Sequence, residues 1–514
     1  MESPPARLRN RRDGESFAGE GGPRAGRPGH GSRASSPTTS ETTMPHRTPE
    51  RRLLVLSLLA AAHFTSTPAS ADWSNLGGNP ARNGLTSAVG PATPTLRWSG
   101  ASLSLIAWTP IVEGGRVFNI RQTVAGSPLL DPNNSMLHAL DLATGNQLWT
   151  YEFPWQPGDW TMVLYGARDG RVYTGRADDG FTRSSAIHCL DAATGKLLWT
   201  TACDTCAPGL YDGVVFTDDG DLIAVAGLNI RRIDGETGAV VWTAPHQFSI
   251  SGSSGPALVG NSIYVHERGP NNTIRVGCFD AATGAKRYSS APLPVFFTQT
   301  EVFAGSNGMV FFPVVPRISP ETDRLYAYQD TGTGLELRWS APCAAFGGEG
   351  GATADGGVVF VNYDGFLEIR DQLTGALRAT SSVPVAAVPT FLTSPHIVVD
   401  GAGTIFFGNG GFPGTVFAFN PDLSLRWSVE VPNLNEGGPV LAGDGTLLIA
   451  GVGNDFRAYY DPGCAAADLN CDGAVNAQDL AALLGAWGGS GAGDLDGSGV
   501  VGAPDLAILL SAWG

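Results

Sequence analysis

The feature that most constrains this chain is a short pattern that returns along most of its length. It consists of an apolar residue, Asp, two variable residues, Thr and Gly, with an aromatic residue four positions after the Gly, and its first copy spans residues 140–149. The Asp carboxylate can accept hydrogen bonds from the backbone of the following turn, and Gly supplies the positive φ that a tight turn needs. Each copy therefore predicts two antiparallel strands joined by a locally fixed turn.

The copies are regularly spaced. Clear copies begin at Asp191, Asp234 and Asp280 with Trp199, Trp242 and Tyr288 in the aromatic position, and weaker ones are Asp330 with Trp339, Asp371 with Ala379, and Asn420-Pro421-Asp422 with Trp427. From residue 141 to residue 461 the mean step is about 46 residues. A period of this size, built from strands and Gly-rich turns, predicts an all-β propeller with one four-stranded sheet per blade.

The two ends of the repeat indicate how the ring closes. Asp461 stands where an eighth turn would begin, but no aromatic strand follows it. Residues 96–99 have the sequence Leu-Arg-Trp-Ser, which matches residues 337–340 and 425–428. We expect this early strand to complete the last blade and remove the open sheet edges. Eight blades are predicted, with seven as the alternative.

The repeat resembles that of the quinoprotein-type (PQQ-like) β-propellers over roughly residues 72–461. We expect the repeated Trp side chains to dock one blade onto the next. The resemblance also implies enzymes that hold pyrroloquinoline quinone (PQQ) with a calcium ion, a catalytic carboxylate, a stacking aromatic and cationic groups, often with a disulfide between adjacent cysteines. This sequence has no adjacent cysteines. No residues can be assigned to the other roles, so cofactor-binding residues stay unknown and PQQ is not expected.

The N-terminal region predicts export. Residues 1–43 are rich in Arg, Pro, Gly and Ser and are expected to be disordered or untranslated. Residues 44–71 read as a signal peptide, with an apolar run at 53–64 and cleavage after Ala71. That run is short for a membrane span, and none is predicted elsewhere. The expected location is extracellular or at the cell surface, with the periplasm as the alternative.

The net charge and the cysteines exclude some classes of function. The formal net charge is −16, which disfavours binding to nucleic acid. Cys203 and Cys206 could form a disulfide within one loop or stay as free thiols, and Ala207 stands where a haem attachment motif requires His. Cys464 and Cys471 flank the start of the next domain and could link it to the preceding segment.

After residue 462 a second repeat predicts two calcium loops. A twelve-residue EF-hand-type loop uses oxygen ligands at positions 1, 3, 5, 7, 9 and 12 and Gly at position 6. The predicted ligands of the first loop are Asp468, Asn470, Asp472, Ala474, Asn476 and Asp479. Those of the second are Asp494, Asp496, Ser498, Val500 and Asp505. Each loop leads into a helix, and the apolar stripes Leu480, Leu483, Leu484, Trp487 and Leu506, Leu509, Leu510, Trp513 are expected to pack together.

The paired loop–helix unit resembles type I dockerins over residues 468–514. That resemblance implies calcium, a cohesin-like or other protein partner, and a context of polysaccharide degradation. A Ser-Thr pair at loop positions 10 and 11 contacts cohesin in well-known dockerins, whereas this chain has Ala477-Gln478 and Ala503-Pro504. The second loop has Ser498 in place of a carboxylate and Gly502 at position 9, so the first loop is expected to bind calcium more tightly.

Three functions remain open at this stage. The favoured one is a non-catalytic binding or assembly platform, as in the propeller subunit of the outer-membrane assembly machinery, tethered through the dockerin-like module. The alternatives are a PQQ-dependent oxidoreductase and a polysaccharide-active enzyme, which would need two carboxylates at one cleft. Loop carboxylates are Asp159, Asp169, Asp178, Asp179, Asp218, Asp219 and Glu349. His138, His188 and His266 lie near strands, and no catalytic residue is assigned. A deep axial pocket lined by convergent charges would favour an enzyme. A narrow axis filled by side chains would favour a platform.

Overall fold

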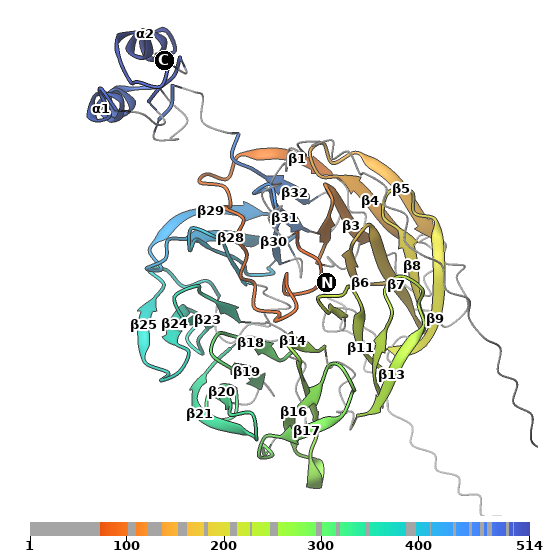
Figure 1. Ribbon diagram of the computed structural model, residues 1–514. Helices are drawn as coiled ribbons and strands as arrows, with labels where there is room; N and C mark the ends of the chain where they lie inside the picture. Colours follow the sequence, from red (N-terminus) through yellow and green to blue (C-terminus); the bar gives the residue numbers. More distant parts are fainter. Residues whose placement is uncertain are drawn as a thin grey trace, which may run out of the picture. The chain divides into compact units, whose positions relative to one another are not determined.

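The computed structural model describes residues 72–100, 109–121, 136–152, 162–178, 183–205, 213–226, 229–246, 255–294, 301–314, 319–344, 350–386, 397–411, 413–434, 438–451, 455–462, 467–469, 475–489, 493–496 and 498–513. Within these ranges the strands form eight four-stranded antiparallel sheets arranged as the blades of a ring (Figure 1). The prediction of eight blades is confirmed.

The blades follow one another along the chain, with the first-named strand of each innermost. Blade 1 holds β2 (Ile111–Glu113), β3 (Arg116–Arg121), β4 (Met136–Asp141) and β5 (Gln147–Glu152). Blade 2 holds β6 (Met162–Arg168), β7 (Arg171–Asp178), β8 (Arg183–Asp191) and β9 (Leu197–Thr205). Blade 3 holds β10 (Val215–Phe216), β11 (Leu222–Ala226), β12 (Asn229–Ile233) and β13 (Val240–Pro245). Blade 4 holds β14 (Ala257–Val259), β15 (Ser262–Arg268), β16 (Ile274–Asp280) and β17 (Lys286–Ser289), with a short 3-10 turn, η2 (Pro270–Asn272), between β15 and β16.

The second half of the ring repeats this order. Blade 5 holds β18 (Phe303–Ala304), β19 (Met309–Val314), β20 (Arg324–Asp330) and β21 (Leu335–Pro342). Blade 6 holds β22 (Gly351–Ala352), β23 (Gly357–Val361), β24 (Leu367–Asp371) and β25 (Leu377–Thr380). Blade 7 holds β26 (Ile397–Val399), β27 (Ile405–Gly408), β28 (Gly414–Phe419) and β29 (Leu425–Val431).

Blade 8 joins the two ends of the propeller. It consists of β30 (Pro439–Leu441), β31 (Leu447–Ala450), β32 (Phe456–Tyr459) and, as its outer strand, β1 (Leu96–Gly100). β1 pairs antiparallel with β32, and Trp98 stands opposite Ala458. The predicted closure of the ring by residues 96–99 is therefore confirmed, and its physical gain is that β32 is paired along both of its edges.

The repeated turn has the geometry that its sequence predicts. In the first copy, Asp141 Oδ1 accepts hydrogen bonds from the Thr144 backbone N–H at 2.9 Å and from its hydroxyl at 2.7 Å. The next glycine, Gly145, has a φ of 70°. The same bonds from Thr to Asp recur at Asp191, Asp234, Asp280 and Asp371. These hydrogen bonds lower the pKa of Asp141, Asp191, Asp234 and Asp371, and the hydrogen bond from Arg287 is the main cause of the lowered pKa of Asp280.

At most junctions a repeated tryptophan docks one blade onto the next, as predicted. Trp149 of blade 1 donates its indole N–H to the Ala192 carbonyl of the blade 2 turn at 3.1 Å. Its ring covers Gly195, where an added Cβ would lie 2.6 Å from the ring. The same bond from an indole N–H to a backbone carbonyl joins Trp98 to Leu142, Trp242 to Ala281 and Trp339 to Gln372. Between blades 4 and 5, Tyr288 makes the junction through its hydroxyl, which donates to Asp330 at 2.5 Å.

The C-terminal region contains two short helices, α1 (Ala477–Gly485) and α2 (Ala503–Ser511). Each has an Asp at its third position, Asp479 or Asp505, whose carboxylate accepts a hydrogen bond from the N-cap backbone N–H. Leu483 and Leu509 are fully buried between the helices. This small core follows from one apolar residue per helix at equivalent positions of the 26-residue repeat.

Candidate functional site

The axis of the ring is crossed by a stretch of the chain itself. Residues 72–91, here called the axial segment, run through the middle of the ring on the face that carries the Asp turns (Figure 1). Its carbonyl groups accept hydrogen bonds from backbone N–H groups of the innermost strands of six blades. The pairs, given as carbonyl and donor, are Trp73 and Val112, Ser74 and Ala167, Pro80 and Leu258, Ala81 and Ala304, Asn83 and Ala352, and Gly84 and Val399, all at 2.7–2.9 Å.

Side chains of the axial segment reach the two remaining blades. The Asp72 carboxylate accepts hydrogen bonds from the backbone of Gly114 in blade 1 at 2.7 Å and of Gly443 in blade 8 at 3.2 Å. Arg82 donates from its guanidinium to the carbonyl of Gly213, at the start of blade 3, at 3.2 Å. The axial segment therefore bonds to all eight blades.

Arg82 is the central residue of this segment. It is fully buried and adopts a φ of 55°, which is uncommon for a residue with a side chain. Its Nε donates to the Pro256 carbonyl in blade 4 at 2.7 Å. A buried guanidinium needs hydrogen-bond partners to offset desolvation, and here backbone carbonyls of neighbouring blades supply them.

Sequence reasoning missed the axial segment. It has no strand periodicity, and its bonds are made mostly by the backbone to residues more than a hundred positions away. The available signal was an unexplained Asn- and Gly-rich stretch with a Trp at its start, lying between the expected cleavage site and the first strand.

The described side chains at the axis do not match a quinone site. Trp73, Asn75, Leu76 and Arg82 are each at most 2% exposed, and the Arg82 guanidinium is bonded to two carbonyls. The described residues contain one group of three or more metal-ligating side chains within reach of each other, and it belongs to the C-terminal loops. We therefore derive no step through a quinone.

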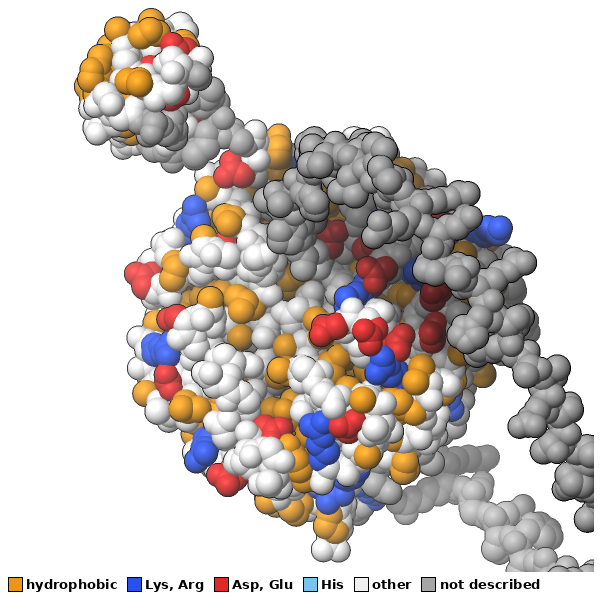
Figure 2. Space-filling model, in the orientation of Figure 1, with side chains coloured by type: hydrophobic (Ala, Val, Ile, Leu, Met, Phe, Trp, Pro, Cys, Tyr) orange, Lys and Arg blue, Asp and Glu red, His pale blue; other side chains and the backbone are white. Residues whose placement is uncertain are grey.

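The loop carboxylates proposed for glycan chemistry are partly described. Asp169 and Asp219 follow the inner strands of blades 2 and 3, on the face of the Asp turns, and form ion pairs with Arg168 and Arg232 at 3.3 and 3.2 Å. Figure 2 shows acidic and basic side chains mixed on this face. Such exposed pairs are typical of a solvated surface. Asp218 is also exposed, while Asp159, Asp179, Glu349 and the Asp178 side chain lie outside the described residues.

The described histidines and cysteines of the ring lie in separate blades or in its core. His138, His188 and His266 belong to blades 1, 2 and 4, and His266 stacks on Phe312 with ring centroids 5.5 Å apart. Cys189, Cys278 and Cys343 are buried. Burial raises the pKa of the Cys189 thiol to about 12, which makes it unreactive at neutral pH. Cys206, Cys464, Cys471 and the Cys203 side chain lie outside the described residues.

The second predicted calcium loop brings its carboxylates together. Oxygens of Asp494, Asp496 and Asp505 lie within 4.8 Å of one another. Asp505 is buried and accepts hydrogen bonds from the backbone of Leu495 at 2.7 Å, Asp496 at 3.0 Å and Gly502 at 2.6 Å. These bonds, with that from Gly502 the strongest, lower the pKa of Asp505. A cluster of three carboxylates is suited to a hard divalent cation.

The backbone of this loop also fits the predicted pattern. Gly499, at loop position 6, has a φ of 90°, as the sharp bend requires. Ser498 is placed near Asp494 and Asp496 by its backbone N–H, which donates to both carboxylates at 3.0 and 2.9 Å. Val500 is exposed.

The first loop is described in part. Asp468 and Asp479 are buried, and Asn476 caps α1 while accepting a hydrogen bond from the Gln478 backbone at 2.8 Å. Asn470, Asp472 and Ala474 lie outside the described residues.

One prediction for the helices was wrong. Leu483 and Leu509 pack together, but Leu484, Trp487, Leu510 and Trp513 are each 45–51% exposed. A nine-residue helix can bury only one narrow face against a partner of the same length, so half of each apolar stripe stays outside. Figure 2 shows hydrophobic side chains gathered on one side of this small unit.

Comparison with known proteins supports the propeller. A family model described as outer membrane protein assembly factor BamB matches residues 133–291, which run from blade 1 into blade 4. No curated protein matches the sequence significantly.

Several solved structures match this chain at low identity. Quinohemoprotein alcohol dehydrogenase from Comamonas testosteroni is 13% identical, with 76% of this chain and 80% of that chain covered and a TM-score of 0.53. BamB from Moraxella catarrhalis is 13% identical, with 69% and 97% covered and a TM-score of 0.46. The computationally designed Ika8 protein is 14% identical, with 71% and 99% covered and a TM-score of 0.49.

The fold class is thus an eight-bladed, PQQ-like β-propeller accompanied by two short C-terminal helices. Neither helix of the described chain has the length and apolar character needed to cross a membrane.

Proposed function

We propose that this protein is an exported, non-catalytic propeller that serves as a binding or assembly platform and is tethered to a protein partner through a calcium-loaded C-terminal module. In this proposal residues 44–71 direct export, residues 72–462 form the platform, and residues 463–514 form a dockerin-like domain. Loss of the leader makes Asp72 the first residue of the exported chain.

The observation that carries the platform proposal is the filled axis. Propeller enzymes need a pocket in which charged groups converge on a substrate or cofactor. On the face of the Asp turns, this ring instead holds its own residues 72–91, whose bonds reach every blade. A rigid ring closed in this way is suited to presenting its loops and outer strands to another macromolecule.

The docking proposal rests on the exposed face of the two helices. Leu484 on α1 and Leu510 on α2 occupy equivalent positions of the repeat, as do Trp487 and Trp513, which directly follow these helices, and all four side chains are about half exposed. Large aromatic and aliphatic side chains anchor protein interfaces when a partner desolvates them. A cohesin-like module is the partner class that the dockerin-like pattern favours.

The calcium proposal rests on the second loop, where three carboxylates converge around a positive-φ glycine. The first loop has the richer predicted ligand set and is proposed to bind the tighter ion. Calcium would neutralise the clustered carboxylates and hold the loops that orient both helices.

Calorimetric titration of the full exported chain with calcium chloride tests the metal sites. We expect two sites, with the tighter one lost in Asp479→Asn and the weaker one lost in Asp505→Asn. Equal affinities, or no binding, would contradict the assignment.

Docking is tested by binding of a purified cohesin module to the same chain, with calcium or with a chelator. We expect calcium-dependent binding that falls at least tenfold in the double variant Leu484→Asp, Leu510→Asp. A double variant that binds as tightly as the parent chain, or a parent chain that binds no cohesin, would overturn the docking proposal.

A further inference from the structure

The junction between blades 6 and 7 lacks the contact between an aromatic ring and a turn glycine that is found at most of the other junctions. The position of the docking aromatic holds Ala379, and the turn that it should cover holds Leu423 where the other turns have glycine. Leu423 keeps the left-handed backbone of that position, with a φ of 63°, and is fully buried. It belongs to the same apolar cluster as Ala379. A large side chain on the turn therefore replaces part of the missing ring.

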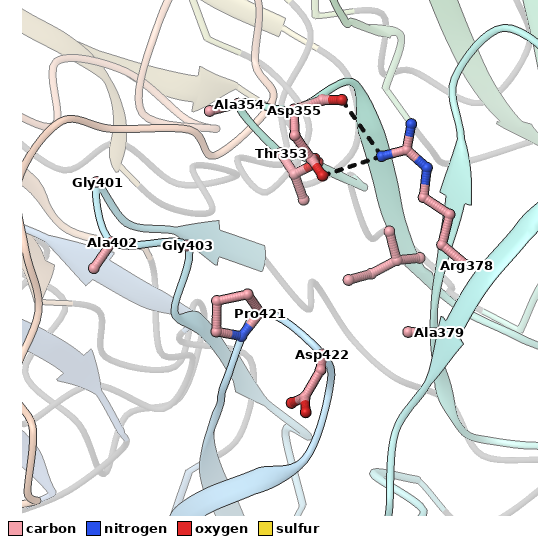
Figure 3. A pocket seen from close by; sticks show the side chains of 11 residues that line it. Thr353, Ala354, Asp355, Arg378, Ala379, Gly401, Ala402, Gly403, Pro421 and Asp422 are labelled. Atoms are coloured by element: carbon pink, nitrogen blue, oxygen red, sulfur yellow. Dashed lines mark hydrogen bonds and ion pairs between the residues drawn. The ribbon is translucent and has the colours of Figure 1, made fainter.

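With Ala379 in the aromatic position, a cavity of about 520 Å³ lies between the two blades (Figure 3). Ile369 and Ala379 line it from blade 6, and Gly403, Pro421 and Asp422 line it from blade 7. At the matching place between blades 5 and 6, the Trp339 ring lies on Gly375, where an added Cβ would be 2.7 Å away. The cavity thus lies where neighbouring junctions hold an indole.

Polar groups surround the apolar wall of this cavity. Arg378 is held by Asp371 at 2.6 Å and by Asp355 at 3.3 Å, so its guanidinium is fixed at the rim. At four tryptophan junctions the indole N–H donates to the carbonyl of the second turn residue, as Trp339 does to Gln372 at 2.9 Å. The second turn residue here is Pro421, and none of the described residues donates a hydrogen bond to its carbonyl.

We propose that this cavity binds a small planar aromatic molecule with an N–H donor, of the indole class. Its ring would lie against Ile369, Ala379 and Pro421, its N–H would donate to the Pro421 carbonyl, and Arg378 would lie at its edge. Leu423 occupies the inner part of the space, so the ring sits further out than a built-in tryptophan. This site is independent of the proposed platform and calcium functions.

Indole itself is the probe for the test. The full chain, labelled with ¹³C at the isoleucine methyl groups, is titrated with indole and followed by NMR. We expect a saturable shift of the Ile369 methyl, with a dissociation constant on the order of millimolar, and no shift of Ile263 in the core of blade 4. No saturable change at Ile369, or an equal change at Ile263, would overturn the proposal.

Variants that fill the cavity provide a second test of the indole site. The double variant Ala379→Trp, Leu423→Gly rebuilds the docking pair, and Ala379→Leu fills the cavity while leaving the turn unchanged. We expect indole binding to weaken at least tenfold in whichever variant keeps the thermal transition of the parent chain. Unchanged binding in a folded variant would contradict the site.

Discussion

At the residue scale, the propeller depends on a repeated contact between an aromatic ring and a glycine. The indole covers the positive-φ glycine of the next blade and donates to a carbonyl of the same turn. The sequence was sufficient to predict this role for the tryptophans, because a residue that recurs once per blade serves the contact that recurs once per blade. The sequence did not predict that the small Ala379 in the aromatic position is compensated by the large Leu423 on the facing turn. The two residues lie on different blades, and the effect of each side chain on packing depends on the size of the other.

Two glycines separate the effect of the ring from the effect of the backbone. Gly195 and Gly170 have φ values of 70° and 75°, but an added Cβ meets Trp149 at 2.6 Å in the first case and open space in the second. We expect Gly170→Ala to cost about 1 kcal/mol from backbone strain alone, and Gly195→Ala to cost several kcal/mol because it displaces the indole. Differential scanning calorimetry of the two variants measures the difference, and equal losses would show that the ring contact contributes nothing.

The turn aspartates predict acid sensitivity. Hydrogen bonds lower the pKa of Asp371, chiefly from the Thr374 backbone, and of Asp280, chiefly from the Arg287 side chain, to about 2 in each case, below the unfolded value of about 3.9. Since the folded pKa is the lower one, each carboxylate stabilises the ring above pH 4, and this contribution is lost as pH falls towards 2.

Thermal unfolding of the parent chain and of Asp371→Asn between pH 7 and pH 2 tests this prediction. The variant should be less stable at pH 7 and should lose less stability on acidification. Parallel curves for the two proteins would contradict the role of this carboxylate.

At the scale of elements, the centre of the ring is built from very short strands and from the axial segment. Three-residue inner strands such as β14 are held by the second strand of the blade on one side and by the axial segment on the other. The element boundaries followed from the sequence where a turn pattern marked them. The C-terminal helices show the limit of such reasoning, because an apolar stripe indicates which side chains could be buried but not how much partner surface exists to bury them.

The axial segment predicts a strong effect of Arg82. Arg82→Met should reduce the free energy of unfolding by about 2–4 kcal/mol, because the carbonyls of Pro256 and Gly213 lose their buried donor. Arg338→Met is the matched control, since Arg338 is 45% exposed and 3.5 Å from Glu336, and should change stability by less than about 1 kcal/mol. Urea unfolding measures both, and a similar small loss in the two variants would mean that the axial segment does not hold the ring.

At the scale of the whole molecule, periodicity was enough to predict the blade number and the closure by residues 96–99. The blade number follows from the number of repeats. The closure follows because the last repeat lacks an outer strand and a matching strand precedes the first repeat. The axial segment could not be predicted in the same way, since it belongs to no repeat and bonds to each blade through a different residue or atom. The filled axis is the feature that most separates the proposed platform from an enzyme built on the same fold.

The most direct test is a titration of the full exported chain with pyrroloquinoline quinone and calcium, followed by calorimetry and by dye reduction with alcohols and aldoses. The account predicts no saturable binding at millimolar quinone and no substrate-dependent reduction. Saturable binding with turnover would contradict it and would identify the ring as an oxidoreductase.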